Sequence, residues 1–264
     1  LPPGSVLIAN GHGHKVRRYF ALEPRPHEDN PGRTIETVRF LCEQAVEDAM
    51  PLNQASMLSG GLDSTALTAL MARRTDRPVA SFSVDYEDNA QYFTPGAFQP
   101  ERDEPYILQA VAHLGTRHRS VLLPQRALVE TLEEAMALRG LPGMADIDSA
   151  LMLFARQIAH EHPSVVSGEC GDEVFGGYPW FHRADLMAAD GFPWSGSLPF
   201  RERVLKPRVR EKLRLSEYAS ARYHEAVAAL PRLSSDTPEE ARLRQLHGLC
   251  FQWFMPNLQE RALR

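Results

Sequence analysis

Cysteine and long hydrophobic runs are scarce in this sequence. Its three cysteines, Cys42, Cys170 and Cys250, form an odd set without the spacing of a metal site, which is typical of reduced thiols in the cytosol. No apolar run approaches the length that crosses a bilayer, and the first residues lack a signal-peptide pattern. We therefore expect a cytoplasmic protein with no membrane partner.

Lysine is also rare, since only Lys15, Lys206 and Lys212 occur and none lies near a glycine-rich motif. The net charge of −5 argues against a nucleic-acid binder that relies on phosphate contacts, so we expect no nucleic-acid partner. Hydrophobic residues at 43% and charged residues at 24% are ordinary globular values, and 264 residues can bury a substantial core.

Hydrophobic patterns typical of strands and helices alternate through the middle of the chain. Because this alternation favours right-handed crossovers, the predicted fold class is α/β, a parallel sheet with helices on both faces, followed by a helical C-terminal region. A short β remnant is expected at the N-terminus. The expected strands are 5–9, 15–20, 55–58, 79–84, 118–123 and 164–167, and the expected helices are 35–49, 64–73, 104–114, 125–138, 150–160, 201–214, 217–230 and 238–254.

The order of the parallel strands predicts where a ligand binds. We expect strand 55–58 to be central, with the next two strands building outward on one side and strand 164–167 returning to its other side. This order, 3-2-1-4, creates a switch point at the carboxyl ends of the first and fourth strands. A nucleotide is expected in that crevice.

A glycine-rich run, SGGLDS at residues 59–64, follows the first of these strands and precedes a helix. Such a turn bares backbone N–H groups beside the positive end of a helix dipole, which is a site for phosphate. The run is not a Walker A loop, which has Lys and then Ser or Thr after its last glycine. A carboxylate beside polyphosphate is repulsive without a divalent cation between them. We therefore interpret Asp63 as a Mg²⁺ ligand and Ser59 and Ser64 as hydroxyl donors. The alternative is a plain tight turn with a helix N-cap.

A second run, VVSGECGDEVFGGY at residues 165–178, reduces the number of families that the sequence can resemble. The first run resembles the pyrophosphate-loop motif of the ATP pyrophosphatases, and the second is similar to the second motif of the asparagine synthetase family. The stretches 113–116 and 141–149 also look like that family. The resemblance therefore covers nearly the whole chain and points to the C-terminal synthetase domain of glutamine-hydrolysing members, with an adenine nucleotide α-hydrolase-like fold.

The motifs assign roles to individual residues. Backbone N–H groups of the first run would hold the β and γ phosphates of ATP, and Asp63 and Asp172 would share Mg²⁺. The resemblance implies that Glu169 is linked to forming the acyl adenylate and that Asp103 matches a family acid near the pyrophosphate, a further Mg²⁺ candidate. The first run supplies the expected phosphate contacts Ser59, Gly60, Gly61, Leu62, Asp63 and Ser64, and the resemblance implies that Leu58, Val84, Ser167 and Gly168 contact the nucleotide. The plain alternatives are a loop acid for Glu169 and helix caps for Asp172 and Asp103.

Two further segments are weaker candidates. The stretch Asp85–Asp103 lacks a clear period and is long enough to be a functional loop, so we suggest a lid over ATP. Asp148 and Ser149 are candidates for gripping the α-amino group of the substrate, with helix capping an equal alternative.

The resemblance implies a reaction and its partners. Aspartate would be converted to asparagine through β-aspartyl-AMP, with release of AMP and pyrophosphate and with nitrogen supplied as ammonia from glutamine. ATP and Mg²⁺ are the expected cofactors. Residues 1–33 are expected to be the tail of a glutaminase domain plus a linker, and 34–264 an ATP-dependent synthetase domain that is incomplete at its C-terminus. A homodimer is compatible with this interpretation.

Other functions stay open at this point. A β-lactam synthetase or a lasso-peptide macrolactam synthetase would use the same activation with another amine. An adenylating tRNA-modifying enzyme predicts a basic RNA surface, which the sequence does not indicate. A nucleotide-binding domain without turnover is disfavoured by the three acids Asp63, Glu169 and Asp172.

Overall fold

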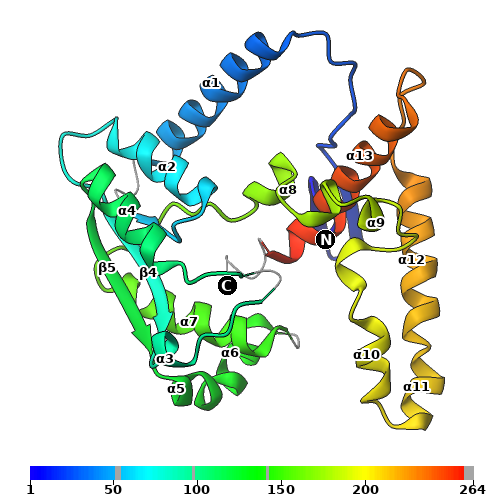
Figure 1. Cartoon of the computed structure of the whole chain (residues 1–264). Coiled ribbons are helices and arrows are strands. Elements are labelled where there is room, and N and C mark those ends of the chain that lie inside the picture. Colours follow the sequence, from blue (N-terminus) through cyan, green and yellow to red (C-terminus); the bar gives the residue numbers. More distant parts are fainter. Residues whose placement is uncertain (51–54, 97–98, 141–142, 259–264) are drawn as a thin grey trace. The chain divides into compact units, whose positions relative to one another are not determined.

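The computed structural model describes residues 1–50, 55–96, 99–140 and 143–258 (Figure 1). The described residues form two compact units: Asp29–Glu169 is one, and Leu1–Glu28 joins Cys170–Leu258 in the other. We call them the sheet unit and the helical unit. The domain division 1–33 and 34–264 concerns function and stays a prediction.

The sheet unit is built from parallel strands and their crossover helices. Its elements are α1 (Pro31–Ala49), β3 (Ala55–Met57), α2 (Leu62–Ala72), β4 (Ala80–Tyr86), α3 (Asn89–Tyr92), α4 (Glu104–Leu114), β5 (Arg117–Leu123), α5 (Gln125–Glu130), α6 (Leu132–Arg139) and α7 (Ala145–Ala159). The strands are short, parallel and joined by helices, as the alternating pattern predicts.

The strand order places β3 at the switch point. The hydrogen-bonded order is β3-β4-β5, and Val166 forms a parallel bridge with Ser56 on the free side of β3. Two backbone bonds make this bridge, from Met57 N–H to the Val166 carbonyl at 2.8 Å and from Val166 N–H to the Ala55 carbonyl at 2.9 Å. The predicted order 3-2-1-4 is confirmed, although the expected strand 164–167 is reduced to this one bridge.

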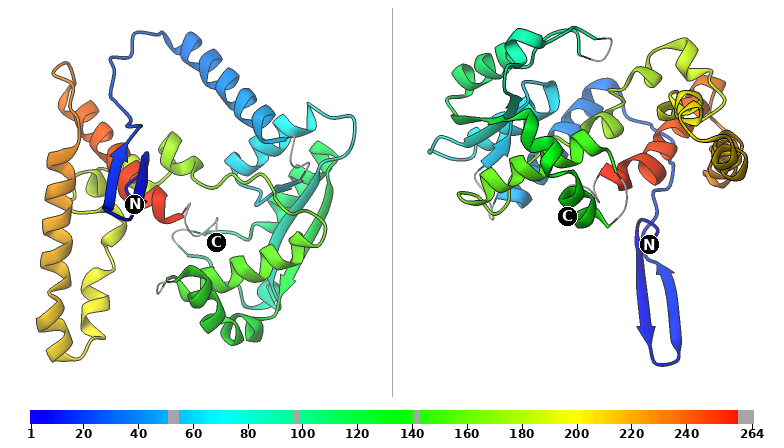
Figure 2. Two further views of the ribbon diagram at one scale, coloured as in Figure 1. Left: turned by 180° about the vertical axis from the view of Figure 1, so that it is seen from behind. Right: turned by 90° about the horizontal axis from the view of Figure 1, so that it is seen from below.

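Helices cover both faces of the sheet, as predicted. On one face Phe82 and Val121 pack in a buried cluster with Phe154 and Ile158 of α7. On the other face α2 lies over β3, where the Thr68 hydroxyl donates to the Ser56 hydroxyl at 2.9 Å. Figures 1 and 2 show α7 and α2 on opposite sides of the strands. The α/β fold class is confirmed.

A buried polar row crosses the α2 side of the sheet. Ser81 and Ser83 of β4 contact the two ring nitrogens of His118 on β5 at 2.9 and 3.0 Å, and Ser81 also donates to Thr116. Both serines are at most 5% exposed. Burial lowers the pKa of His118 because the imidazolium form would lose its hydration. Neutral His118 therefore fits between two hydroxyls.

The helical unit follows the second motif, and its helical C-terminal region is confirmed. Its elements are β1 (Ser5–Asn10), β2 (Gly13–Arg18), α8 (Gly171–Phe175), η2 (Pro179–Phe181), α9 (Ala184–Met187), η3 (Pro193–Ser195), α10 (Leu198–Arg203), α11 (Pro207–Leu213), α12 (Leu215–Ala229), α13 (Pro238–Leu249) and η4 (Cys250–Phe254). Trp180 and Phe181 pack with Leu246 and Cys250 in its buried core.

The two N-terminal strands form an antiparallel hairpin, as expected from the sequence. Ser5 pairs with Arg18 at the open end, and Gly4 accepts backbone bonds from Tyr19 and Phe20. Apart from Ser5, every residue of both strands is exposed. A two-stranded hairpin is marginal in water, so this one needs neighbours that lie outside the described contacts.

Two of the expected helices are interrupted. The helix expected at 125–138 breaks at Thr131, whose backbone leaves the helical region (φ −102°, ψ 4°) and whose hydroxyl donates to the Ala127 carbonyl. The helix expected at 201–214 breaks before Pro207, because proline disfavours helical geometry in the residue before it. Pattern alone does not reveal either break. No helix of the described residues is long and apolar enough to span a bilayer.

The lowered pKa of His118 predicts a loss of stability in mild acid. The unfolded chain, with an ordinary histidine pKa of about 6.5, gains protons before the folded chain does. The free energy of unfolding should therefore fall as the pH drops below that value. His118→Gln should cost about 1–2 kcal/mol at neutral pH by disturbing two buried hydrogen bonds, and should flatten the acid slope.

Urea unfolding at a series of pH values measures both effects. Exposed His113→Gln is the matched control and should keep the wild-type slope. Burial also lowers the pKa of His247. This residue should therefore leave a smaller dependence of stability on pH in the His118→Gln variant. An unchanged slope in His118→Gln would contradict the assignment.

Candidate functional site

The glycine loop 58–61 joins β3 to α2 and is pressed against α4. Gly60 has a φ of +78°, which only glycine adopts freely. A Cβ at Gly60 would lie 2.8 Å from both the Ile107 nitrogen and the Tyr106 Cβ. The loop therefore needs glycine twice over, for its conformation and for its contact with the first turn of α4. The sequence gives no local signal of this contact.

The two serines of the loop bond to each other. The Ser59 and Ser64 hydroxyls are 2.9 Å apart, and Ser64 also donates to the Gly61 carbonyl and accepts the Ser59 N–H. Ser64 is 8% exposed, whereas Ser59 is exposed. Ser64 thus holds the loop in shape, and Ser59 is the hydroxyl that a ligand can reach.

The first turn of α2 offers backbone donors. Its N-cap is Gly61, and no side chain caps the helix. Leu62 is 86% exposed, and Asp63 lies in this turn. The initial N–H groups of a helix have no partner within the helix and carry partial positive charge, so this end favours an anion. The predicted phosphate donors are therefore at an accessible helix start.

Gly168 brings the second motif onto this same turn. A Cβ at Gly168 would lie 2.9 Å from the Ser64 nitrogen and 3.2 Å from the Asp63 carbonyl carbon. The adjacent bridge of Val166 to Ser56 holds the segment in place. The Ser167–Gly168 end of the second motif thus meets the first motif at the carboxyl edge of the sheet, although about a hundred residues separate them.

The expected nucleotide contacts lie along this edge. Leu58 is buried at 1% exposure, and its N–H donates to the Phe82 carbonyl. Leu58 therefore anchors the start of the loop to β4. Val84 is 38% exposed near the end of β4, and Ser167 is exposed. The Ser167 hydroxyl accepts the N–H of Glu169, an exposed residue at the end of the sheet unit.

Three acids are the predicted metal ligands. Asp63 is in the first turn of α2, and Asp103 is at the start of α4, the helix that touches Gly60. The Asp103 carboxylate accepts from Gln99 and does not cap α4. Asp172 is in α8, in the helical unit, so its pairing with Asp63 stays a prediction. Within the described residues no group of three or more metal-ligating side chains exists.

This donor set suits a magnesium ion that arrives on a polyphosphate. Mg²⁺ keeps several waters and is commonly held by one or two carboxylates together with substrate phosphates. Asp63 beside backbone N–H groups supplies that combination. A closed cage of protein ligands is not required.

The acids of α8 differ in their surroundings. Asp172 is exposed, and a Cβ at Gly177 would collide with its carboxylate at 1.8 Å. Glu173 is 1% exposed and accepts the Tyr178 hydroxyl at 3.0 Å. Glu173 is therefore a buried structural residue, and Gly177 leaves room for the Asp172 carboxylate.

Asp148 and Ser149 have structural surroundings. The Asp148 carboxylate accepts the Met144 N–H at 2.9 Å and pairs with Arg139 at 3.4 Å. Ser149 is fully buried. The bond of Asp148 to the Met144 N–H favours the capping alternative for that residue, whereas the Ser149 hydroxyl makes no hydrogen bond among the described residues and caps nothing. The side chain of Asp146 lies outside the described residues.

The candidate lid is anchored at both ends. The Asp85 carboxylate accepts from Asn89 at 2.6 Å and pairs with Arg102 at 3.5 Å. This ion pair joins the start of the segment 85–103 to its end. A closing motion of the segment stays a prediction.

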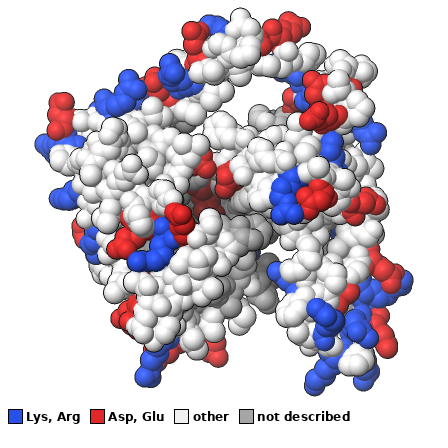
Figure 3. Space-filling view, viewed as in Figure 1, with Lys and Arg blue, Asp and Glu red and all other residues white. Residues whose placement is uncertain are grey.

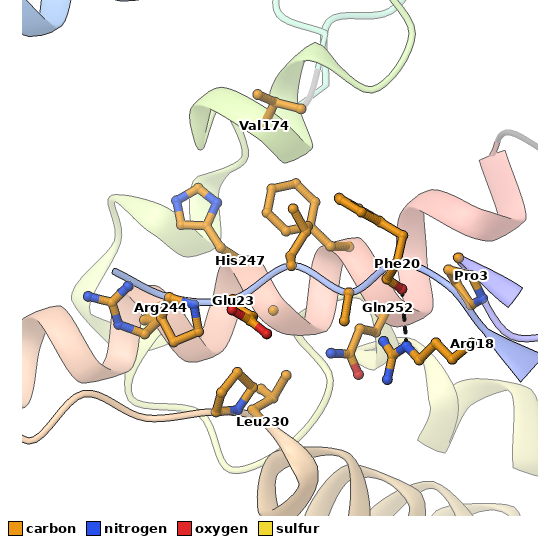
Figure 4. A pocket seen from close by; sticks show the side chains of 16 residues that line it. Pro3, Arg18, Phe20, Glu23, Val174, Leu230, Arg244, His247 and Gln252 are labelled. Carbon is orange, nitrogen blue, oxygen red and sulfur yellow. Dashed lines mark hydrogen bonds between the residues drawn. The ribbon is translucent and has the colours of Figure 1, made fainter. Parts of the chain in front are cut away.

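The helical unit has a cavity of its own, of about 440 Å³ (Figure 4). The N-terminal tail, including Phe20 and Glu23, forms one side, and α13 forms the other. Arg244 at its edge is paired with Asp236, and the His247 ring contacts the Glu173 carbonyl. The cavity therefore lies beside the second motif, behind α8. In the same unit, burial raises the pKa of the Cys250 thiol to about 11, so this cysteine is unreactive.

Comparison with known proteins decides the family. The family model described as asparagine synthase matches residues 37–263. The chain belongs to the asparagine synthase family. Over its whole length it is 40% identical to asparagine synthetase [glutamine-hydrolyzing] 3 of Bacillus subtilis, covering 44% of that protein. Over 70% of its length it is 28% identical to asparagine synthetase B of Escherichia coli, covering 33% of that protein.

The chain thus spans less than half the length of these curated relatives. Among solved structures, it is similar to the NMN synthetase of Francisella tularensis, with 13% identity and a TM-score of 0.35 over 89% of this chain and 92% of the other. So distant a likeness carries no argument here.

The contact of Gly168 with α2 predicts a sensitive position. Gly168→Ala places a Cβ against backbone atoms that cannot swing away. It should lower the free energy of unfolding by about 1–3 kcal/mol through overpacking. Gly196→Ala is the matched control, because Gly196 has an ordinary φ of −56° and a Cβ there would meet no heavy atom within 4 Å. Urea unfolding compares the two. Equal stability of both variants would show that the contact is not tight.

Proposed function

We propose that this chain carries the ATP-dependent synthetase site of an asparagine synthetase. It would convert aspartate to asparagine through β-aspartyl-AMP and release AMP and pyrophosphate. The observation that supports this proposal most is the contact of Gly168 with the start of α2. It joins the two family motifs at the switch point of a parallel sheet, where α/β proteins bind nucleotides.

The triphosphate would lie on the glycine loop. N–H groups of Gly60, Gly61, Leu62 and Asp63 would bind the β and γ phosphates, and Ser59 would add a hydroxyl donor. ATP would enter as its magnesium complex, held by Asp63 with Asp172 and Asp103 as further ligands. The bound ion supplies charge neutralisation between the carboxylate and the polyphosphate.

Two bond exchanges complete the proposed reaction. A β-carboxylate oxygen of aspartate attacks the α-phosphorus, and the bond to the pyrophosphate breaks. Ammonia then attacks the acyl carbon, the bond to AMP breaks, and a proton leaves the nitrogen. Because the first step brings two anions together, the protein's main task is to position them and to present donors to the departing pyrophosphate. Glu169, next to Gly168, is the proposed residue at the reacting acyl group.

Glutamine would supply the ammonia through a separate glutaminase domain. The exposed hairpin of β1 and β2 is consistent with the tail of such a domain, since it needs neighbours to be stable. We propose that the whole protein acts in the cytoplasm on small-molecule substrates.

Removal of the Asp63 carboxylate tests the proposed phosphate site. Asp63→Asn should reduce aspartate-dependent exchange of labelled pyrophosphate into ATP by about a hundredfold, since the loss of one preorganised group costs on the order of 3 kcal/mol. Asp76→Asn, which changes an exposed acid of the sheet unit, is the control and should keep the wild-type rate.

The choice of acid in the exchange assay tests the substrate. Exchange that requires aspartate supports asparagine synthesis. Exchange that requires a different acid would show that the substrate is not aspartate, while the proposed adenylation would still hold. Full activity of Asp63→Asn would overturn the site itself. Calorimetric titration with Mg·ATP separates loss of nucleotide binding from loss of chemistry.

A further inference from the structure

A strongly basic segment interrupts this acidic chain. Leu198–Arg214, which we call the basic arm, contains α10 and α11 and carries seven Arg and Lys residues against two Glu. The chain as a whole has a net charge of −5. Figure 3 shows blue side chains gathered over α10 and α11. Positive charge is therefore concentrated on one surface of the helical unit.

Most of these cations have no acidic partner. The structure describes every residue of the arm and records no ion pair for Arg201, Lys206, Arg208 or Lys212. Arg214 pairs with Glu217 of α12, and the Arg203 guanidinium lies 5.5 Å from the centre of the Phe200 ring. The unpaired cations are free to meet an external anion.

Exposed apolar side chains lie between the cations. Phe200 and Val204 are 62% and 72% exposed, and Val209 and Leu213 are 40% and 47% exposed. Each pair has the spacing i, i+4, so it forms a stripe along one face of its helix. On a helical projection Arg201 and Arg203 flank the first stripe, and the second lies between Arg208 with Lys212 on one side and Arg210 on the other.

The two acids of the arm lie on the opposite side of each helix. Glu202 and Glu211 are each about half a turn from the apolar stripe of their helix. The Glu202 carboxylate accepts the Ser216 N–H at 2.9 Å and its hydroxyl at 2.7 Å, which fixes α10 to the start of α12. The stripe and cations of α10 therefore face away from α12.

The α11 helix is exposed along its whole length among the described residues, and its link to α10 is the charge interaction of Arg210 with Glu202. All seven of its residues are exposed. Isolated helices shorter than about 12–15 residues are marginal in water, and most helices gain their stability by packing an apolar face. Val209 and Leu213, which are 40% and 47% exposed, are the apolar face of α11, so part of that face is open to an external surface.

We propose that the basic arm binds the surface of an anionic lipid bilayer. Basic amphipathic helices lie in the headgroup region with apolar side chains in the acyl boundary and cations among the lipid phosphates. Both helices of the arm have this arrangement. A nucleic acid would pair with the cations but would leave four apolar side chains in water. The expectation of no membrane partner rested on the lack of a spanning segment, which surface binding does not need.

Sedimentation with vesicles tests the proposal on the whole chain. The protein should sediment with vesicles of two parts phosphatidylcholine to one part phosphatidylglycerol, and not with phosphatidylcholine alone. High salt should release it, because the cations attract the headgroups through screened charge. The variant with Arg201, Arg208, Arg210 and Lys212 all changed to Gln should bind about a thousandfold more weakly, since each basic residue near an anionic surface contributes about 1 kcal/mol.

Matched variants separate position from total charge. Changing Arg17, Arg25, Arg39 and Arg77 to Gln removes the same charge from exposed sites elsewhere and should leave vesicle binding nearly unchanged. The variant Val204→Ser, Val209→Ser, Leu213→Ser should bind about tenfold more weakly, because its side chains no longer enter the acyl boundary.

Three outcomes would overturn the proposal. One is no sedimentation with the anionic vesicles. Another is equal loss in both four-residue charge variants, which would mean non-specific attraction. The third is full vesicle binding by the serine variant together with tight binding to a duplex nucleic acid, which would assign the arm to nucleic acid. Circular dichroism of each variant verifies that it is folded.

Discussion

The backbone contact between Gly168 and the first turn of α2 is the constraint on which the candidate site depends. This contact favours the absence of a side chain at residue 168, because a Cβ there would lie only 2.9 Å from the Ser64 nitrogen. It also requires the strand-like pairing of Val166 with Ser56, which fixes the position of the second motif along β3. Both requirements are met by backbone atoms. Backbone atoms alone therefore hold the Ser167–Gly168 segment against the glycine loop within the sheet unit.

Different residues of the glycine loop fix its conformation and face the solvent. Gly60 adopts a left-handed conformation and touches α4, while Ser64 closes the turn with its hydroxyl. The outward side of the loop is left with backbone N–H groups and the exposed Ser59. A turn that orients N–H donors at a helix start is what phosphate binding needs, because the donors are positioned before the ligand arrives.

Charge is distributed unevenly over the chain. The acids Asp63 and Asp103 lie at helix starts beside the glycine loop, where a magnesium-bound nucleotide is proposed. The cations gather instead on the basic arm, beyond the second motif. Two of the three lysines are in the arm and none is near the loop. Lysine is therefore absent from the proposed phosphate site and concentrated on the basic arm.

The sequence by itself determined the elements and the chemistry of the motifs. Alternating patterns predict the parallel strands and the helical region, and the run at 59–64 predicts a phosphate loop, because these signals depend on residues close together in the chain. The family resemblance follows from the same local runs. The sequence left helix capping and substrate binding as equal alternatives for Asp148 and Ser149, because the contacts of these residues depend on packing of α7 against its neighbours.

Only the tertiary structure decided which distant atoms touch. The contacts of Gly60 with α4 and of Gly168 with α2, and the exposure of the stripes on α10 and α11, all depend on how elements pack. A glycine in a sequence permits close approach of another segment, but the sequence alone does not identify that segment. A stripe of apolar residues predicts a covered face, and only the folded chain shows that its own core leaves that face bare.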